Sequence, residues 1–229
     1  MLFRSAVPDM RIRYTTSHPQ DMSDQLIETM AMHANICKYI HLPVQSGSNR
    51  ILSLMNRTHP VEHYYERIEM IKKLMPECAL STDIITGFPT ETEEDHEATM
   101  ELMRRVRYDG AYMFKYSPRE RTKAWKMGDD IPDDIKVRRL NEIINQQNVI
   151  AREINQTLIG KTEYVLVEGP SKKNPLEWQG RTDSNKVAIF PQHEHAPYVI
   201  GDIIPVIIEK ASSATLFGRD RKSTRLNSS

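Results

Sequence analysis

The amino-acid sequence predicts an α/β fold, in which a partial barrel of parallel strands and helices is followed by a small all-β barrel. Up to about residue 158, strand-like and helix-like runs alternate, an order that implies parallel strands with right-handed crossovers. From Lys161 the runs are short, β-rich and separated by turn clusters, as is typical of a small barrel. We therefore divide the chain into residues 1–159, residues 160–220 and a tail over residues 221–229, which resembles a cloning scar more than a natural terminus.

The first elements lead to the stretch around which the chain is organised. Alternation over residues 11–17 predicts a strand, and residues 25–31 predict a short capped helix. In residues 40–45, apolar side chains alternate with polar ones, so the two sets point to opposite faces of a strand. The small residues at 46–48 form a turn, and a capped helix begins at about Arg50. Ligands usually bind at such strand–helix turns.

The remaining elements of the first part continue the alternation of strands and helices, and the second part contains short strands only. The first part is expected to continue with helices over residues 60–75, 92–107 and 132–158, and with strands over residues 79–87 and 111–117. The apolar face of the last helix is predicted to consist of Val137, Leu140, Ile143, Ile144 and Ile150. The strands predicted for the small barrel cover residues 163–168, 179–182, 186–190 and 203–210.

Composition restricts the class of protein. Lys and Arg together number 31, as do Asp and Glu, so net charge gives no argument for nucleic-acid binding and any basic surface must be local. The two cysteines, Cys37 and Cys78, lie far apart and form no C-x-x-C pattern, so neither a disulfide framework nor a zinc site is indicated. Without an apolar run of membrane-spanning length or an apolar leader, we expect a cytoplasmic protein that has no membrane contact.

Polar side chains are expected to line the inner face of the partial barrel. Interiors of closed small barrels are normally branched and apolar, so a polar inner set indicates a cavity for a polar ligand. Asp83 could accept from a hydroxyl or amine, Gln45 can donate and accept, and Gly47 and Gly87 would permit close approach of a ligand. The alternative is that neighbours across the sheet satisfy these groups. By parity, the inward set is Arg13, Thr15, Ser17, His41, Gln45, Asp83 and Lys115.

Three further groups of residues have a structural and a functional interpretation. His193 and His195 could be metal ligands, but no third ligand is near and a surface loop is favoured. Cys37 and Cys78 could be cluster ligands, but each precedes a predicted strand, which favours core positions. The basic loop over residues 119–126 could contact phosphate or could simply be solvated.

Several motifs closely resemble those of the MiaB family, the radical-SAM methylthiotransferases that make 2-methylthio-N6-isopentenyladenosine in tRNA. They occupy residues 11–19, 41–48, 81–89 and 212–218, in the family's order. The Thr-Thr-Ser-His-Pro version at residues 15–19 points to the isopentenyladenosine branch. Sister branches that act on threonylcarbamoyladenosine or on a ribosomal protein remain alternatives.

The resemblance implies a partial radical-SAM barrel followed by a TRAM domain that grips tRNA. It implies S-adenosylmethionine (SAM) and two 4Fe-4S clusters in the full-length family, with an external electron donor and a sulfur source as partners. The expected SAM contacts are Gln45, Ser46, Gly47, Asp83 and Gly87. The expected tRNA contacts are Arg13, His41, Lys115, Arg119, Lys161, Lys172, Lys173, Arg181 and Lys186.

The chain also departs from the family pattern. The C-x-x-x-C-x-x-C motif and the cysteine-bearing N-terminal domain are absent, so we expect a C-terminal fragment without cluster ligands that is inactive alone. Thr90 stands where glycine is common, and Arg121 replaces the glycine before Thr122, which would strain the loop if a positive φ is needed. The competing hypothesis is a non-catalytic RNA-binding module. Basic and acidic residues balance over residues 157–219, so composition does not indicate strong RNA binding.

Overall fold

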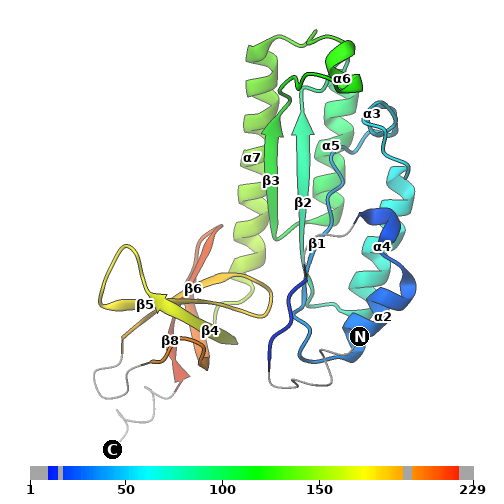
Figure 1. Ribbon diagram of the computed structural model, residues 1–229. Helices are drawn as coiled ribbons and strands as arrows, with labels where there is room; N and C mark the ends of the chain where they lie inside the picture. Colours follow the sequence, from blue (N-terminus) through cyan, green and yellow to red (C-terminus); the bar gives the residue numbers. More distant parts are fainter. Residues whose placement is uncertain (1–9, 15–17, 193–197, 222–229) are drawn as a thin grey trace, which may run out of the picture.

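The protein consists of a three-stranded parallel sheet with helices on one side and a separate closed barrel of five strands (Figure 1). The computed structural model describes residues 10–14, 18–192 and 198–221. The helices are η1 (Pro19–Asp21), α2 (Asp24–Met32), α3 (Asn49–Leu54), α4 (Val61–Leu74), α5 (Glu93–Val106), α6 (Lys123–Lys126) and α7 (Asp133–Gln156). The sheet strands are β1 (Tyr39–His41), β2 (Ala79–Thr86) and β3 (Gly110–Lys115). The barrel strands are β4 (Thr162–Pro170), β5 (Glu177–Arg181), β6 (Val187–Pro191), β7 (Ile203–Ala211) and β8 (Thr215–Asp220).

The sheet has the order β1-β2-β3 and all its pairs are parallel, which confirms the arrangement predicted from the strand–helix alternation. One face packs against the helices and forms the main hydrophobic core, to which Ile40, Leu80 and Ile84 contribute from the strands. The opposite face carries the alternate residues of β2, among them Asp83. None of the helices among the described residues is both long enough and apolar enough to span a bilayer.

Two strand predictions are wrong in extent. Over residues 11–14 the only pairing is a bridge between Ile12 and Ile36, and residues 15–17, including Thr15 and Ser17, lie outside the described residues. β1 stops at His41 instead of continuing to Gln45. Pro43 has no N–H to donate to the ladder, and Gln45 adopts a left-handed backbone with φ 75°, so the chain leaves regular strand geometry early.

The buried face of α7 differs from the apolar face predicted for this helix. Ile143 and Ile150 are buried as expected, but Val137 is exposed. Lys136 and Arg139 are buried instead, because each is paired with a carboxylate from a loop at the top of the sheet. Hydrophobic periodicity could not reveal this face, because two of its residues carry charged side chains that a search for apolar spacing leaves out.

The small barrel confirms the predicted all-β second part. Its strands close in the order β4-β5-β6-β8-β7, around a core to which Val165, Phe190, Val206 and Leu216 contribute. β8, which the strand prediction missed, closes the barrel by pairing with β6 in parallel and with β7 in antiparallel orientation. Its apolar residues are fewer than those of its neighbours β6 and β7, and they end at Gly218.

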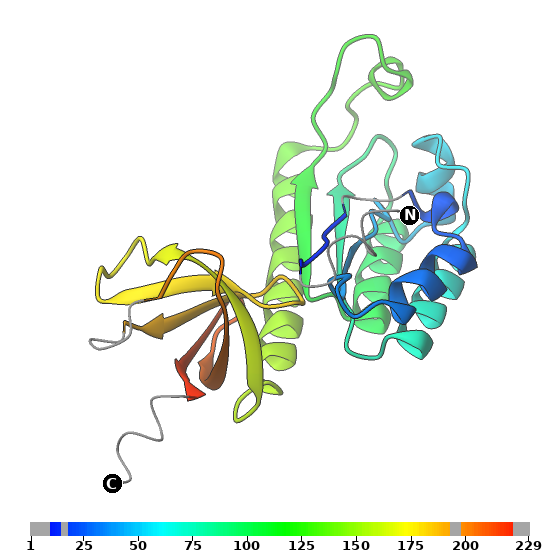
Figure 2. The same cartoon turned by 60° about the horizontal axis from the view of Figure 1, so that its bottom comes forward.

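The barrel lies at the end of the sheet where β2 and β3 begin, opposite the ends to which their arrowheads point (Figures 1 and 2). α7 leads into it, and the chain then turns at Gly160, whose N–H donates to the carbonyl oxygen of Ile208 at 2.8 Å. The Nδ2 of Asn155, near the end of α7, donates to the carbonyl oxygen of Ser212 at 2.9 Å. The helix is therefore bonded directly to the barrel that follows it.

Candidate functional site

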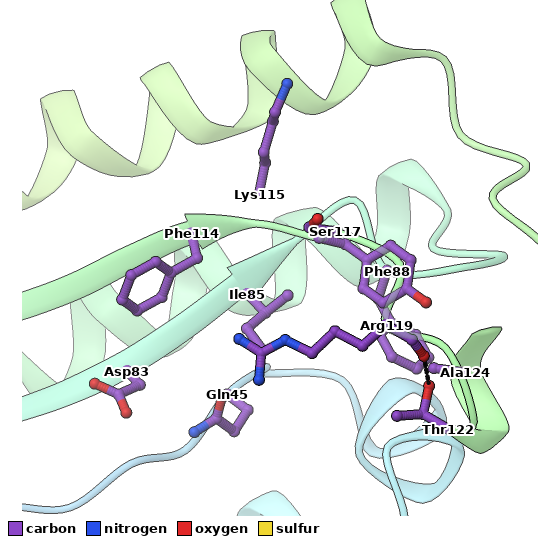
Figure 3. A pocket seen from close by; sticks show the side chains of 11 residues that line it. Gln45, Asp83, Ile85, Phe88, Phe114, Lys115, Ser117, Arg119, Thr122 and Ala124 are labelled. Atoms are coloured by element: carbon purple, nitrogen blue, oxygen red, sulfur yellow. Dashed lines mark hydrogen bonds between the residues drawn. The ribbon is translucent and has the colours of Figure 1, made fainter.

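A cavity of about 570 Å³ opens where β2 and β3 end, on the side of the sheet that the helices leave uncovered (Figure 3). Asp83 reaches it from β2 and Gln45 from the segment that follows β1, so the two side chains meet as the alternation of residues predicted. The remaining walls are largely apolar. The cavity is lined by Gln45, Asp83, Ile85, Phe88, Phe114, Lys115, Tyr116, Ser117, Arg119, Thr122 and Ala124.

Asp83 belongs to a polar row along the open face. Its Oδ1 lies 3.4 Å from Nε2 of His41, whose Nδ1 lies 2.9 Å from Oγ of Ser81. The ring of Tyr112, the register partner of Asp83, meets the His41 ring edge-on at 5.6 Å between centroids. These contacts orient the imidazole, and the Asp83 side chain remains 29% exposed. The row can therefore accept hydrogen bonds from a polar ligand.

Gln45 is held in a strained conformation beside Asp83. Its N–H donates to the carbonyl oxygen of Asp83 at 2.9 Å, and its own carbonyl accepts from the N–H of Ile85 at 2.9 Å. A positive φ costs a non-glycine residue roughly 1–2 kcal/mol, and strain of this kind concentrates at functional sites. The two backbone bonds maintain this conformation and direct the Gln45 amide toward the cavity (Figure 3).

Gly47 and Gly87, where close approach of a ligand was expected, are not among the residues that line this cavity. A Cβ on Gly47 would lie 2.4 Å from the backbone oxygen of Ala98 in α5, and a Cβ on Gly87 would lie 2.4 Å from Cγ of Lys136 in α7. Both glycines therefore permit tight packing of the strand ends against helices. Ser46 is likewise buried, with its Oγ 3.4 Å from Oγ1 of Thr99.

The loop between β2 and α5 is anchored by a buried ion pair that the sequence analysis missed. Arg139 Nη1 lies 2.8 Å from Oε2 of Glu91, and the two side chains are 4% and 1% exposed. The same Oε2 accepts from the N–H of Gly87 at 2.7 Å. Burial raises the pKa of Glu91, whereas Gly87 and Arg139 act to lower it. An arginine four residues before Ile143, on the inward stripe of the helix, was the signal that could have revealed this pair.

Lys115 and Arg119 were both expected near the ligand, and both belong to the cavity lining, but only the Arg119 side chain extends over the cavity (Figure 3). Lys115 pairs in register with Thr86 and turns to the helix side of the sheet, where its Nζ lies 2.6 Å from Oδ1 of Asp133. The predicted inward orientation of Lys115 is therefore wrong, because the strand parity differs by one residue. The exposed Arg119 side chain instead extends across the cavity toward Gln45 (Figure 3).

The other basic residues predicted for RNA contact separate into three sets. Lys161, Lys172 and Lys173 are exposed on the barrel. Arg13 and Lys186 instead join the barrel to the sheet: Arg13 donates to backbone oxygens of the barrel, and Lys186 pairs with an aspartate at the sheet. Arg181 pairs within the barrel, with its Nε 3.3 Å from Oε1 of Glu168.

Two loop positions have the backbone that the family resemblance implied. Thr90 has φ 65° and Arg121 has φ 68°, so both non-glycine residues occupy the left-handed region that glycine favours. The expected loop strain is therefore present at Arg121. Thr90 offsets part of its strain by accepting a hydrogen bond from Arg50 Nη1 at 3.1 Å.

The cysteines occupy core positions, as predicted. Cys37 and Cys78 are free and buried, and burial raises the pKa of the Cys37 thiol to about 11 and that of Cys78 to about 12. Among the described residues, no group of three His, Cys, Asp or Glu could hold a metal ion. His193 and His195 lie outside the described residues. The cysteines of this chain therefore do not fit a 4Fe-4S cluster, which requires thiolate ligands.

Comparison with protein families divides the chain as the two folded parts do. Residues 2–103 match the Radical SAM superfamily, and residues 156–219 match the TRAM domain. Among solved structures, the chain is similar to coproporphyrinogen III oxidase HemN of Escherichia coli, a radical SAM enzyme. The TM-score is 0.53 at 12% identity, over 77% of this chain and 47% of that one, a likeness that concerns the fold alone.

Curated relatives match nearly the whole chain. It is 52% identical over 224 residues to the tRNA-2-methylthio-N(6)-dimethylallyladenosine synthase of Phocaeicola vulgatus, covering 96% of this chain and 48% of the relative. The synthase of the same name from Bacteroides thetaiotaomicron is 53% identical over 216 residues, covering 94% of this chain and 47% of the relative. The chain thus spans about half the length of these relatives. The chain therefore combines a Radical SAM part with a TRAM part and is similar, over nearly its whole length, to about half of each of these synthases, in agreement with its resemblance to the MiaB family.

Proposed function

We propose that this chain supplies the later strands of the catalytic barrel and the RNA-gripping domain of a tRNA methylthiotransferase. The reaction would add a methylthio group to C2 of N6-isopentenyladenosine in tRNA. The observation that carries the proposal is the meeting of Gln45 and Asp83 in one cavity at the carboxyl ends of parallel strands, on a chain that also carries the TRAM barrel. Cofactors bind at this edge of such sheets.

The cavity fits S-adenosylmethionine in size and chemistry. Its volume of about 570 Å³ lies within the range of small-molecule sites, roughly 300–1,000 Å³. Asp83 would accept from an amine or hydroxyl, Gln45 would both donate and accept, and Phe88 and Phe114 would cover an adenine ring. When bound with its cluster, this cofactor supplies the radical that removes hydrogen from C2. The cluster ligands, a second cluster, an electron donor and a sulfur source would come from outside this chain.

The barrel would hold tRNA through phosphate contacts. Lys161, Lys172 and Lys173 present exposed ammonium groups on its surface, and each can pair with a phosphate oxygen. At the cavity, Arg119 extends over the opening and would neutralise a phosphate next to the reacting nucleotide. His41 would contact the nucleotide on the open face. Such an enzyme works where its tRNA is, so we place it in the cytoplasm.

A chimeric enzyme tests the proposal. The chain would be joined behind the N-terminal half of the Bacteroides thetaiotaomicron synthase, which is 53% identical in the shared region. The chimera would then be expressed in cells that lack the methylthio modification. Mass spectrometry of digested tRNA should detect the 2-methylthio nucleoside. A folded chimera that yields none, beside a native enzyme that does, would refute the proposal.

A matched pair of variants tests the role of the cavity in the same chimera. Asp83→Asn removes the carboxylate that would accept from the cofactor and should lower product formation about tenfold or more. Asp134→Asn makes the same change on the exposed first turn of α7 and should leave it unchanged. Equal activity of the two variants would remove Asp83 from the proposed site.

A further inference from the structure

The turn between β5 and β6 faces the sheet and is bonded to it at several points. Arg13 Nη2 donates to the carbonyl oxygen of Thr182 at 2.6 Å, and its Nη1 donates to that of Asp183 at 3.3 Å. The Asp183 carboxylate accepts from the backbone N–H of Lys38 at 2.9 Å, immediately before β1. Residues from two separate segments of the first part thus converge on one hairpin turn of the barrel.

Lys186 completes this contact with an ion pair. Its Nζ lies 2.5 Å from Oδ1 of Asp109, and the two side chains are only 11% and 16% exposed. The other oxygen of Asp109 accepts from the N–H of Leu80 at 2.9 Å, so the aspartate is itself fixed at the beginning of β2. A pair this shielded from solvent is screened less by salt than a surface pair.

We infer that the β5–β6 turn, residues 182–186, is a latch that fixes the orientation of the barrel relative to the sheet. Arg13, Asp109 and Lys186 are its positioning residues. Domains joined by a single connection normally move relative to each other unless their interface is large and hydrophobic. Here charged groups and backbone carbonyls hold the two parts, in addition to the connection through Gly160.

The latch sets the distance between the two sites of the proposed function, and this consequence rests on that function. The barrel lies where β2 begins and the cavity lies where it ends (Figure 1). The eight residues of β2 span about 26 Å at about 3.3 Å per residue. An RNA held by the barrel must therefore extend about this far to place a base in the cavity.

The latch itself is tested on the 229-residue chain without RNA, so its failure is distinguishable from failure of the proposed function. Lys186→Glu places two carboxylates together at the junction. Amide hydrogen exchange of Lys38, whose N–H is bonded to Asp183, should accelerate on the order of tenfold. The N–H of Val167, bonded within the barrel to the carbonyl oxygen of Asp202, should exchange at an unchanged rate.

Distances between the two parts provide the second measurement. Nitroxide labels at Lys73→Cys in α4 and Leu176→Cys on the barrel occupy exposed positions, and pulsed electron resonance gives the distance distribution between them. The native thiols are buried and have raised pKa values, so they react slowly with the label. The parent chain should give one narrow distribution, and Lys186→Glu a broad one.

Three control variants complete the test. Lys210→Glu makes the same charge change at an exposed position on β7 and should behave as the parent chain does. Lys186→Arg keeps the charge and should keep the narrow distribution. Lys186→Met removes the charge without adding a carboxylate. If Lys186→Glu does not fold, the same exchange rates and distances are measured on Lys186→Met, which should also show faster exchange and a broader distribution. Exchange rates and distances that match those of Lys210→Glu would overturn the latch.

Discussion

The sheet and the barrel bury their apolar side chains in different ways. The barrel closes on itself, so Val165, Val206 and Leu216 point into a core that belongs to the barrel alone. The parallel sheet packs one face on helices and leaves the other open, where Tyr112 is 58% and Phe114 53% exposed. Closure gives the barrel stability independent of a partner, whereas the open face gives the sheet room for a ligand. The difference shows why the cavity lies in the sheet and not in the barrel.

The largest expected effect concerns the buried ion pair of the sheet. Arg139→Met leaves Glu91 buried without its partner and should lower the free energy of unfolding of the sheet by about 3–5 kcal/mol. Urea unfolding followed by hydrogen exchange should locate the loss in β2 and α5, with the barrel strands unaffected. The matched control is Arg138→Met, an exposed arginine whose ion pairs contribute about 1 kcal/mol or less. A loss shared equally by the barrel would contradict the independence of the two parts.

A core deletion in the barrel tests the comparison from the other side. Leu216→Ala removes a fully buried side chain and should cost about 2–5 kcal/mol in the unfolding of the barrel. Leu176→Ala makes the same change where the side chain is 73% exposed and should have almost no effect. Hydrogen exchange of β4 and β7 would measure both. Equal protection in the two variants would show that Leu216 does not support the barrel core.

A smaller expected effect is the dependence of the stability of the sheet region on pH. Burial acts to raise the pKa of Asp95, but hydrogen bonds from Arg50 and Ser48 outweigh it and lower that pKa to about 2. Because the folded pKa lies below the unfolded value, this stabilisation is present above about pH 4 and is lost as pH falls toward 2. It amounts to about 2 kcal/mol. The stability of the sheet region should therefore fall across this window, and Asp95→Asn should flatten the profile. An equal fall in stability in the parent protein and in Asp95→Asn would exclude Asp95 as the cause.

The smallest effect concerns backbone strain in the loop beside the cavity. Arg121→Gly relieves a left-handed residue and should stabilise the protein by at most about 1 kcal/mol, since glycine also adds unfolded-state entropy. Asn56→Gly is the control, because Asn56 has φ 60° and asparagine tolerates this region. Thermal unfolding would compare them. Destabilisation by Arg121→Gly would mean that its side chain contributes more than its backbone costs.

Much of the local structure could be predicted from the sequence. The alternation around Ile40, Leu42 and Val44 identified the buried set, and all three side chains are fully buried. Thr92 and Asp95 have the spacing of a capping box, and they form one at the start of α5. These features depend on residues a few positions apart, and such spacing is visible in the chain itself.

Side-chain partners across the fold could not be predicted in the same way. Lys115 turned to the helix side because β3 takes its register from β2, so that Thr86 rather than Asp83 is its neighbour. Arg13 and Lys186 were predicted to contact RNA, but each binds a residue on the other side of the junction between sheet and barrel.

By itself, the sequence determined most of the order of the strands and helices, several of their caps and turns, and the family that the chain resembles. Periodicity and short motifs encode these features locally. Only the tertiary structure decided which polar groups meet: Gln45 with Asp83 in the cavity, and Lys186 with Asp109 at the latch. The physical reason is that burial makes an unpaired charge or polar group costly, so the partner is selected by proximity in space and not by distance along the chain.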